Sequence, residues 1–512
     1  MATLRQRRFV PVSVSLRDLL GEQYVSAVAR GHALLHGSDE DAAMELACRA
    51  VDLLPESFQQ QQVRLLEKVG QQVTDPLTHS AGGATTAKYA AATRKAMAPV
   101  STAGMFRLAE DGHLHVITKA EHYHVSLGHG FPGWRLLEHA RQLGIPNATH
   151  NNTRGHVTRL LEEQLVAAAG AASGGPDRVL NLETGSLALE AAIKIVLARF
   201  YRAQADSPEP KYEGRVPVLL VMADEEGDIT AGYHGTTLLA QTMRGMWPAI
   251  RQSAEKHGIY RVRAIRPNNI ADLERVFREN DSGHTKIAGF FFELILMNYG
   301  ATTLSSEFLH RMQALCDQHD VPMIIDEIQT GLWSPKLFMF REYGLKPAMI
   351  GLGKGFPGGE YAASRLIFCG DLDVLPQFGA LVTNGQEEIA SLAYLVAMRW
   401  ALANAEVTSA IGEYFETRIR EVADGHRSIV KGVEGRRQLL GIHFHDVSSA
   451  RAFTKQAEAM GLDISVQTYK SSIPPAALTK LPLTAPPEAV DLVVDKLSAA
   501  LVAVEKQASG VA

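Results

Sequence analysis

The pattern of apolar and polar positions changes character at about residues 150 and 405. Between these points, short apolar runs such as VPVLLVMAD and IAGFFFELI alternate with helical patterns such as NIADLERVFREN and SSEFLHRMQALCDQHD. Alternating strands and helices predict a mainly parallel sheet that helices cover on both faces. We therefore predict a large α/β domain over residues 151–405, with its functional groups at the carboxyl ends of the strands.

The flanking regions show other patterns. Residues 1–100 contain helical runs broken by Pro and Gly, which predicts an N-terminal helical extension. In residues 101–150, Asp111-Gly112 lies between alternating apolar runs and predicts a hairpin. Residues 406–512 run helix, strand, helix, helix, which predicts a small C-terminal α+β domain. We expect residues 101–150 to join that small domain.

Composition narrows the function classes. The 512 residues carry 51 basic and 56 acidic side chains, a net charge of −5, which provides no field for nucleic acid or an anionic membrane. No run reaches the 18 or so apolar residues of a membrane span. Cys48, Cys316 and Cys369 are too far apart for a disulfide framework or zinc knuckle, so we expect a cytoplasmic protein. The basic N-terminus leaves an organellar presequence as the alternative.

The segment IGLGKGFPGG, residues 350–359, carries the first candidate for chemistry. Lys354 lies between two glycines that allow a sharp turn after an apolar strand. A lysine in such a place is poorly solvated, and burial lowers its pKa, so that the neutral amine can attack a carbonyl. A surface lysine in a flexible loop is the alternative.

Two further segments suggest a cofactor site. In PMIIDEIQTG, Asp326 ends an apolar strand, where a carboxylate needs a cation such as a protonated pyridine nitrogen. A metal ligand or a helix cap is the alternative for Asp326. In LNLETGSLALEAAIKIVLARF, Thr184-Gly185-Ser186 opens a long helix whose free N–H groups suit a phosphate. An ordinary helix cap is the alternative there.

Together these segments resemble the class III aminotransferases, which are pyridoxal 5'-phosphate (PLP) enzymes of fold type I. The most specific stretch is DEIQTGLWSPKLFMFREYGLKPAMIGLGKGFPGG, residues 326–359, and weaker similarity covers roughly residues 105–500. The resemblance implies that Lys354 forms the Schiff base with PLP and shuttles the proton. It also implies that Asp326 pairs with the pyridine nitrogen and that Gln329 hydrogen-bonds the phenolic oxygen.

The resemblance implies four more cofactor contacts. Gly185 and Ser186 would hold the phosphate, and Tyr233 would stack on the ring, although a core tyrosine is the alternative. Thr383 would reach the phosphate in the neighbouring subunit of a homodimer, although Gln386-Glu387-Glu388 replaces the usual residues after it.

Glu293 matches a family glutamate, but Leu294 and Leu296 replace the Pro and Gln that accompany it, so its role is open.

The resemblance fails where relatives grip the substrate carboxylate. Thr236 stands where an arginine is usual, and Leu478 falls nearest the place of a second arginine. Lys480 is two residues away and is a candidate substitute, although lysine lacks the bidentate fork. The carboxylate clamp is therefore missing or rebuilt, which argues against a plain α-amino acid as the specific substrate.

The histidines do not predict a metal site. Five cluster between His113 and His129, but no acidic or cysteine ligand stands at matching spacing, so we expect no metal. His150 and His156 lie near the substrate pocket of the family and are candidates for substrate contact or for structural roles.

The function that we predict is a PLP-dependent aminotransferase that moves an amino group between an amine or amino acid donor and a carbonyl acceptor. An aminomutase, a racemase or a decarboxylase on the same fold is the main alternative, because the sequence does not fix which substrate bond aligns with the ring. A cofactor-free scaffold protein is the third. The intact Lys354, Asp326 and Gln329 argue against it.

Overall fold

The computed structural model describes residues 8–149, 151–468 and 475–508. Its largest sheet has seven strands in the order β6-β14-β13-β12-β9-β7-β8. Only β14 runs antiparallel to its neighbours, so the mainly parallel sheet predicted from the sequence is confirmed. The strands are β6 (Arg178–Leu182), β7 (Val216–Met222), β8 (Arg261–Ile265), β9 (Thr285–Phe292), β12 (Met323–Asp326), β13 (Met349–Leu352) and β14 (Ser364–Phe368).

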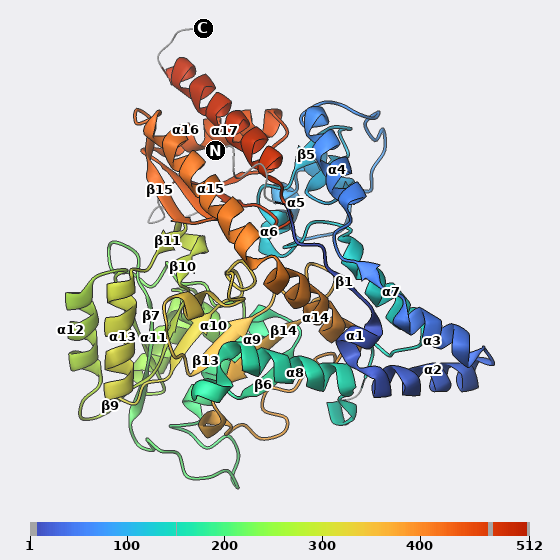
Figure 1. Cartoon of the computed structure of the whole chain (residues 1–512). Helices are drawn as coiled ribbons and strands as arrows, with labels where there is room; N and C mark the ends of the chain where they lie inside the picture. The colour runs from blue at the N-terminus through green and yellow to red at the C-terminus, as the bar shows by residue number, and fades with distance from the viewer. Residues whose placement is uncertain (1–7, 150, 469–474, 509–512) are drawn as a thin grey trace.

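Helices cover both faces of this sheet. Successive residues of a strand point to opposite faces, and the central strands are apolar throughout, so both faces have to be buried. Ile325 packs in a cluster with residues of α12 (Ile270–Asn280) and α13 (Ser306–Gln318). Its neighbour Ile324 packs in a second cluster with residues of α9 (Gly185–Leu197). Figure 1 shows α12 and α13 side by side along one part of the sheet.

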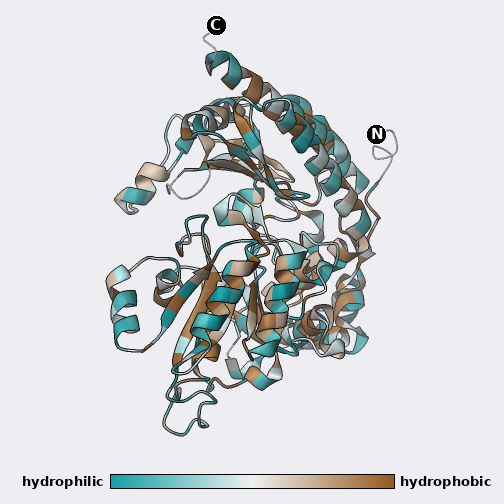
Figure 2. Ribbon diagram, turned by 90° about the vertical axis from the view of Figure 1, so that its left-hand side faces the viewer, coloured by the Kyte–Doolittle hydropathy of each residue, from teal (hydrophilic) through white to brown (hydrophobic). Residues whose placement is uncertain are grey.

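A second, antiparallel sheet forms from the C-terminal region, where the sequence pattern predicted a single strand among helices. Its strand order is β15-β16-β18-β17, and Figure 2 shows it beyond the large sheet. The strands are β15 (Val430–Arg436), β16 (Leu439–Phe444), β17 (Ser465–Gln467) and β18 (Ala476–Lys480). Helices α15 (Ala405–Asp424), α16 (Val447–Ala459) and α17 (Pro487–Ala508) belong to this region, and α14 (Glu388–Ala403) leads into it.

The hairpin predicted at Asp111-Gly112 is confirmed. β4 (Phe106–Ala109) and β5 (Leu114–Val116) pair antiparallel around this turn, and β3 (Pro99–Ala103) completes the sheet. The Val116 N–H donates to the Gly461 carbonyl at 2.8 Å, so this sheet lies against the C-terminal region. The assignment of residues 101–150 to the small domain stays a prediction.

The N-terminal region is mostly helical and lies along one side of the molecule (Figure 1). Two short strands interrupt its helices, because β1 (Ser13–Val14) pairs with β2 (Val51–Asp52). The helices are α1 (Leu16–Leu20), α2 (Glu22–His36), α3 (Glu40–Cys48), α4 (Glu56–Leu65) and α5 (Ala87–Ala92).

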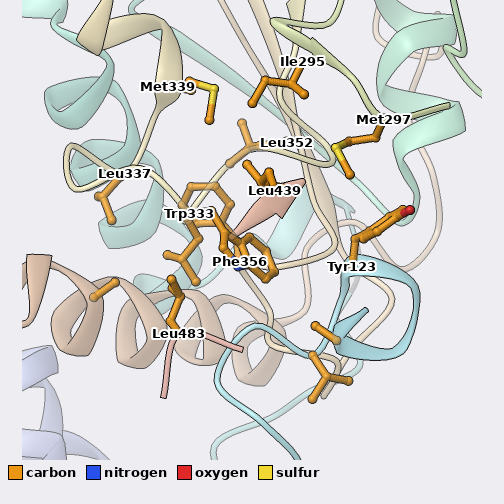
Figure 3. Close-up of a cluster of buried hydrophobic side chains, with 14 of the residues drawn as sticks. Tyr123, Ile295, Met297, Trp333, Leu337, Met339, Leu352, Phe356, Leu439 and Leu483 are labelled. Carbon is orange, nitrogen blue, oxygen red and sulfur yellow. The ribbon is translucent and has the colours of Figure 1, made fainter. Parts of the chain in front are cut away.

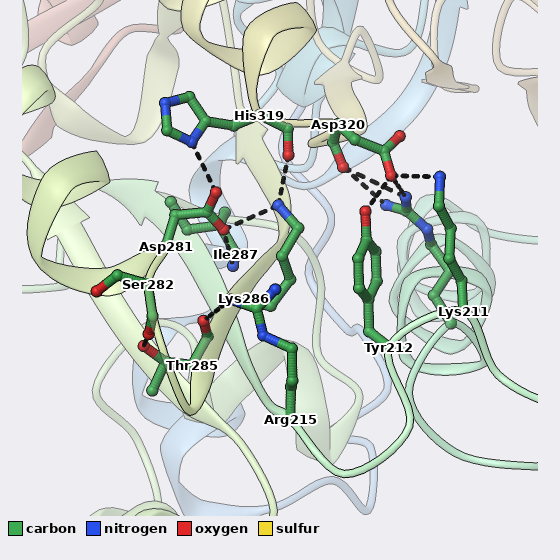
Figure 4. Close-up of polar contacts among 11 residues, drawn as sticks. Lys211, Tyr212, Arg215, Asp281, Ser282, Thr285, Lys286, Ile287, His319 and Asp320 are labelled. Carbon is green, nitrogen blue, oxygen red and sulfur yellow. Dashed lines mark hydrogen bonds and ion pairs between the residues drawn. The ribbon is translucent and has the colours of Figure 1, made fainter.

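A polar cluster surrounds the amino end of β9 (Figure 4). The Lys286 ammonium lies 2.8 Å from the Asp281 carboxylate, which also accepts from His319 at 2.6 Å. The neighbouring Asp320 pairs with Arg199 and Lys211 at 2.5 and 2.7 Å. These groups are satisfied by one another, which indicates a structural role.

The described part of the chain contains no membrane-spanning helix, no disulfide and no cluster of metal ligands. No helix there has the length and apolar composition needed to cross a bilayer. Cys48, Cys316 and Cys369 are all free thiols. No three His, Cys, Asp or Glu side chains in the described ranges gather in a way that would hold a metal ion.

Candidate active site

A cavity of about 800 Å³ opens at the carboxyl ends of the parallel strands. Each strand end contributes a loop or helix start to the same edge of the sheet, so residues far apart in the sequence converge there. Six of the seven residues predicted to bind the cofactor line this cavity: Gly185, Ser186, Tyr233, Asp326, Gln329 and Lys354. The seventh, Thr383, is exposed on the loop before α14 and does not line the cavity of its own chain.

Lys354 lies just after β13 in a constrained turn. Its φ of 41° is in the left-handed region, which side chains other than glycine rarely adopt. The flanking glycines are required by close packing, since a Cβ on Gly353 would lie 2.3 Å from Ser364 and one on Gly355 2.3 Å from Trp333. Burial lowers the pKa of the Lys354 amine, against the opposing charges of Glu293 and Asp326. The turn therefore presents an amine that is easily deprotonated.

Asp326 is held at the end of β12 by two donors. Nδ1 of His234 lies 3.0 Å from one carboxylate oxygen, and the Ile328 N–H donates to the other at 3.1 Å. Asp326 and His234 are both buried, and Nε2 of His234 has no hydrogen-bond partner among the described residues. His234 was not predicted from the sequence, although it directly follows Tyr233.

Gln329 and Glu293 form a buried pair beside Asp326. The Gln329 amide donates to Glu293 at 2.9 Å, which gives Glu293 a contact in the site that the sequence left open. Oε1 of Gln329 and Oε2 of Glu293 have no partner in the ranges that the structure describes. Burial and the nearby Asp326 charge raise the pKa of the Glu293 carboxyl well above its usual range. The surroundings of Glu293 therefore favour its uncharged form.

The start of α9 forms the part of the cavity suited to a phosphate. The Thr184 hydroxyl caps this 13-residue helix by accepting from the Leu187 N–H at 3.4 Å. The Ser186 hydroxyl accepts from the Thr236 N–H at 3.0 Å, which ties the loop after β7 to the helix start. The helix cap, which was the alternative for the Thr-Gly-Ser segment, is therefore present, and the binding of a phosphate by Gly185 and Ser186 stays a prediction.

Tyr233 lines the cavity beside Arg244, a residue that the sequence did not single out. The Arg244 guanidinium carbon lies 4.5 Å from the centre of the Tyr233 ring, which is a cation–π contact. Burial raises the pKa of Tyr233, while the Arg244 charge opposes that rise. Tyr233 therefore presents a neutral ring to the cavity.

An unusual left-handed turn brings His122 to the lining of the cavity. Four successive residues, Ala120–Tyr123, have φ between 44° and 75°, a conformation that costs roughly 1–2 kcal/mol per residue. Glu121 within this turn pairs with Arg107 at 2.7 Å and with His129 at 3.0 Å. These tertiary contacts offset the strain and hold Tyr123 2% exposed, with the Lys354 ammonium 5.4 Å from its ring centre.

Lys480 does not replace the missing carboxylate clamp. Its side chain is 0% exposed and does not line the cavity. The Lys480 ammonium donates to the Gln329 carbonyl and lies 3.5 Å from the centre of the Trp333 ring. Figure 3 shows Trp333 and Tyr123 within a cluster of buried apolar side chains. Burial lowers the pKa of Lys480 well below its usual range, and the Lys354 charge adds to this effect.

Two other residues that the sequence singled out make structural contacts. The Glu388 carboxylate accepts from the N–H groups of Gly155 and Val157 at 3.1 and 2.8 Å, so it caps α8 (His156–Ala169). His156, a candidate for substrate contact, instead stacks on Tyr24 at 4.5 Å between ring centres. His150, the other candidate, lies outside the described residues.

Comparison with known proteins identifies the family. The model of the class-III aminotransferase family matches residues 97–501. A 5-aminovalerate aminotransferase of Pseudomonas aeruginosa is 27% identical over 278 residues, which cover 53% of this chain and 61% of that enzyme. An ornithine aminotransferase of Staphylococcus epidermidis is 26% identical over 338 residues, 63% of this chain and 75% of that enzyme. The match thus spans less than two thirds of the first of these relatives.

Solved structures share the fold. The ornithine aminotransferase of Toxoplasma gondii, whose structure reveals PLP at partial occupancy in its active site, has a TM-score of 0.62 at 22% identity. The two structures overlap over 80% of this chain and 92% of that one. An adenosylmethionine-8-amino-7-oxononanoate aminotransferase of Methanocaldococcus jannaschii reaches a TM-score of 0.66 at 16% identity, over 83% of this chain and 97% of that one. The chain thus belongs to the class III aminotransferases, a family of PLP-dependent enzymes with fold type I.

Proposed function

We propose that this chain is a PLP-dependent aminotransferase and that Lys354 is the residue that binds the cofactor covalently. One observation carries the proposal. The Lys354 amine and the buried Asp326 carboxylate line the same cavity as the start of α9, which is an anion-binding element. An amine, a buried carboxylate and a phosphate site are the three groups that PLP requires.

The cavity residues fit PLP in chemical type. The N–H groups of Gly185 and Ser186 would hold the phosphate, and Asp326 would pair with the ring nitrogen. The Gln329 amide would contact the phenolic oxygen, and Tyr233 would cover the ring face. The unpartnered buried oxygens of Gln329 and Glu293 support this assignment, since such atoms commonly mark a place where a ligand completes the hydrogen bonding.

The side chains around the cavity would have different roles in the reaction. PLP, when bound, supplies an aldehyde for the amino group and a ring that accepts electrons from the substrate. Nζ of Lys354, with its lowered pKa, can take a proton from the substrate carbon and return it. His234 keeps the Asp326 carboxylate in one orientation, and the left-handed turn with Tyr123 shields the Lys354 amine from water.

The assembly and the compartment are part of the same proposal. Thr383 is exposed and lies outside the cavity of its own chain, which supports a homodimer in which it reaches the partner's cofactor phosphate. The partners of the enzyme would be small amines or amino acids and carbonyl compounds. Three free thiols are consistent with a reducing, cytoplasmic compartment.

Borohydride reduction followed by peptide mass analysis tests the covalent assignment. PLP-loaded protein, reduced and digested, should carry the cofactor mass on the peptide that contains Lys354. Lys354→Ala treated in the same way should carry none. Cofactor mass on another lysine, or on no lysine at all, would contradict the proposal. Lys480 serves as the internal comparison because it is the other buried lysine beside this site.

A further inference from the structure

We infer that Arg244, outside the positions where the family's carboxylate-binding arginines would stand, binds a carboxylate of the substrate in this chain. The inference rests on the aminotransferase function proposed above and assigns a substrate-binding residue of that site. Arg244 lines the cavity that contains Lys354 and Asp326.

Arg244 is a cation without an anion. Among the described residues it makes no ion pair within 4.0 Å and no hydrogen bond through its side chain. Its Nε is buried without a partner, and its guanidinium contacts the face of Tyr233. Arginine recognises carboxylates through two parallel N–H donors, and those donors are uncommitted here. What distinguishes Arg244 from other arginines with an unpartnered Nε, such as Arg251, is that it lines the cavity, where an anionic ligand can complete its hydrogen bonds.

The backbone holds Arg244 in place. It follows α10 (Leu238–Thr242), which ends in a Schellman motif. The Met246 N–H donates to the Gln241 carbonyl at 3.0 Å, and the Gly245 N–H donates to the Thr242 carbonyl at 3.3 Å. Gly245 has the positive φ, 83°, that this motif requires. A fixed base for a long side chain reduces the entropy that ligand binding costs.

No other charged side chain that the structure describes around the cavity is a better candidate for binding a carboxylate or already neutralises Arg244. Asp326 is occupied by His234, and Lys480 is enclosed by Trp333. Glu183 lines the cavity but makes no ion pair with Arg244. Apart from the reactive Lys354, Arg244 is the permanently charged cation of this cavity lining.

The anion could also come from the cofactor, whose phosphate shares the chemistry of an oxyanion. The start of α9 already offers N–H groups and the Ser186 hydroxyl for that phosphate. We therefore assign Arg244 to the substrate, and the test separates the two sources.

The test compares Arg244→Met and Arg244→Lys with Arg251→Met in the PLP-loaded protein. Arg251 is the matched control because it lies on the next helix, α11 (Pro248–Lys256), and does not line the cavity. Three quantities are measured for each variant. They are the affinity for PLP by absorbance titration, the affinity for glutarate by calorimetry, and KM for 2-oxoglutarate and for a neutral aldehyde acceptor.

The inference predicts that Arg244→Met weakens glutarate binding and raises KM for 2-oxoglutarate by about 10- to 100-fold, as loss of a charged hydrogen-bond pair does. Arg244→Lys should recover part of this loss. PLP affinity, KM for the aldehyde and all values for Arg251→Met should stay within about twofold of wild type.

Two results would overturn the inference. Unchanged glutarate affinity in Arg244→Met would show that Arg244 binds no substrate carboxylate. A parallel fall in PLP affinity would assign Arg244 to the cofactor phosphate. Failure of the proposed function looks different, because wild type itself would then show no cofactor band and no conversion of any acceptor.

Discussion

Nδ1 of His234 lies 3.0 Å from Oδ2 of Asp326, although 92 positions separate the two residues in the chain. The contact brings the loop after β7 to the end of β12, and both side chains are buried. Because the Ile328 N–H holds the other oxygen at 3.1 Å, the carboxylate has one orientation before any ligand binds. Such preorganisation is what a precise cofactor site requires.

His234 should therefore contribute to PLP affinity through Asp326. His234→Ala removes the donor and leaves Asp326 free to rotate, so we expect the PLP dissociation constant to rise about 10-fold. His234→Asn places an amide nitrogen near the position of Nδ1 and should recover most of that affinity. Absorbance titration of the apoprotein with PLP gives both values. Equal affinity in wild type and His234→Ala would show that the contact is structural only.

Glu293 gives a prediction about stability and pH. Its folded-state pKa is raised above the value of an unfolded chain, so its favourable contribution is present below about pH 4.5 and is lost as the pH rises through the raised pKa. Glu293→Gln keeps the acceptor for Gln329 without the titration. Its melting temperature relative to wild type should therefore be higher at pH 8 than at pH 5.

Glu293→Ala provides the comparison for this effect. It leaves the Gln329 amide without its acceptor, so we expect a loss of about 1–3 kcal/mol in the free energy of unfolding. Scanning calorimetry at pH 5 and pH 8 measures both variants. A melting-temperature difference between Glu293→Gln and wild type that does not vary with pH would contradict a raised pKa.

For Lys480 we expect the stability of the fold to change with pH in the opposite direction. Its folded-state pKa is lowered, so the unfolded chain binds more protons, and stability rises with pH between the lowered pKa and the usual lysine value near 10.5. Lys480→Met should remove this rise, so wild type should gain more melting temperature between pH 7 and pH 9.5 than the variant. The exposed Lys346, changed to Met, is the control and should behave as wild type. Parallel curves for Lys480→Met and wild type would refute the lowered pKa.

Part of the site was predictable because its signals are local. Lys354 stands between glycines after an apolar strand, and Asp326 ends another, so each could be singled out within about ten residues of sequence. The parallel sheet then follows from the strand–helix alternation, and it brings the two together at one edge. The family comparison confirms the fold and the PLP chemistry that the resemblance implied.

The rest depends on contacts that no local pattern encodes. The turn at Ala120–Tyr123 contains no glycine or asparagine, so its left-handed conformation follows only from tertiary pairs such as Glu121 with Arg107. The sequence made Lys480 a candidate ligand for the substrate carboxylate. Its ammonium instead lies against the Trp333 ring and does not line the cavity. Arg244 reaches the cavity only because α10 ends where it does.

The central claim is tested most directly by the visible absorption spectrum of the PLP-loaded protein before and after addition of a panel of amine donors. The account predicts a visible band in wild type that a carboxylate-bearing donor converts to the shorter-wavelength amino form. Lys354→Ala, loaded and dialysed in the same way, should lack the lysine-bound band. A band that shifts but persists with every donor would favour an aminomutase, racemase or decarboxylase and contradict transamination. No band at all in wild type would contradict the PLP assignment itself.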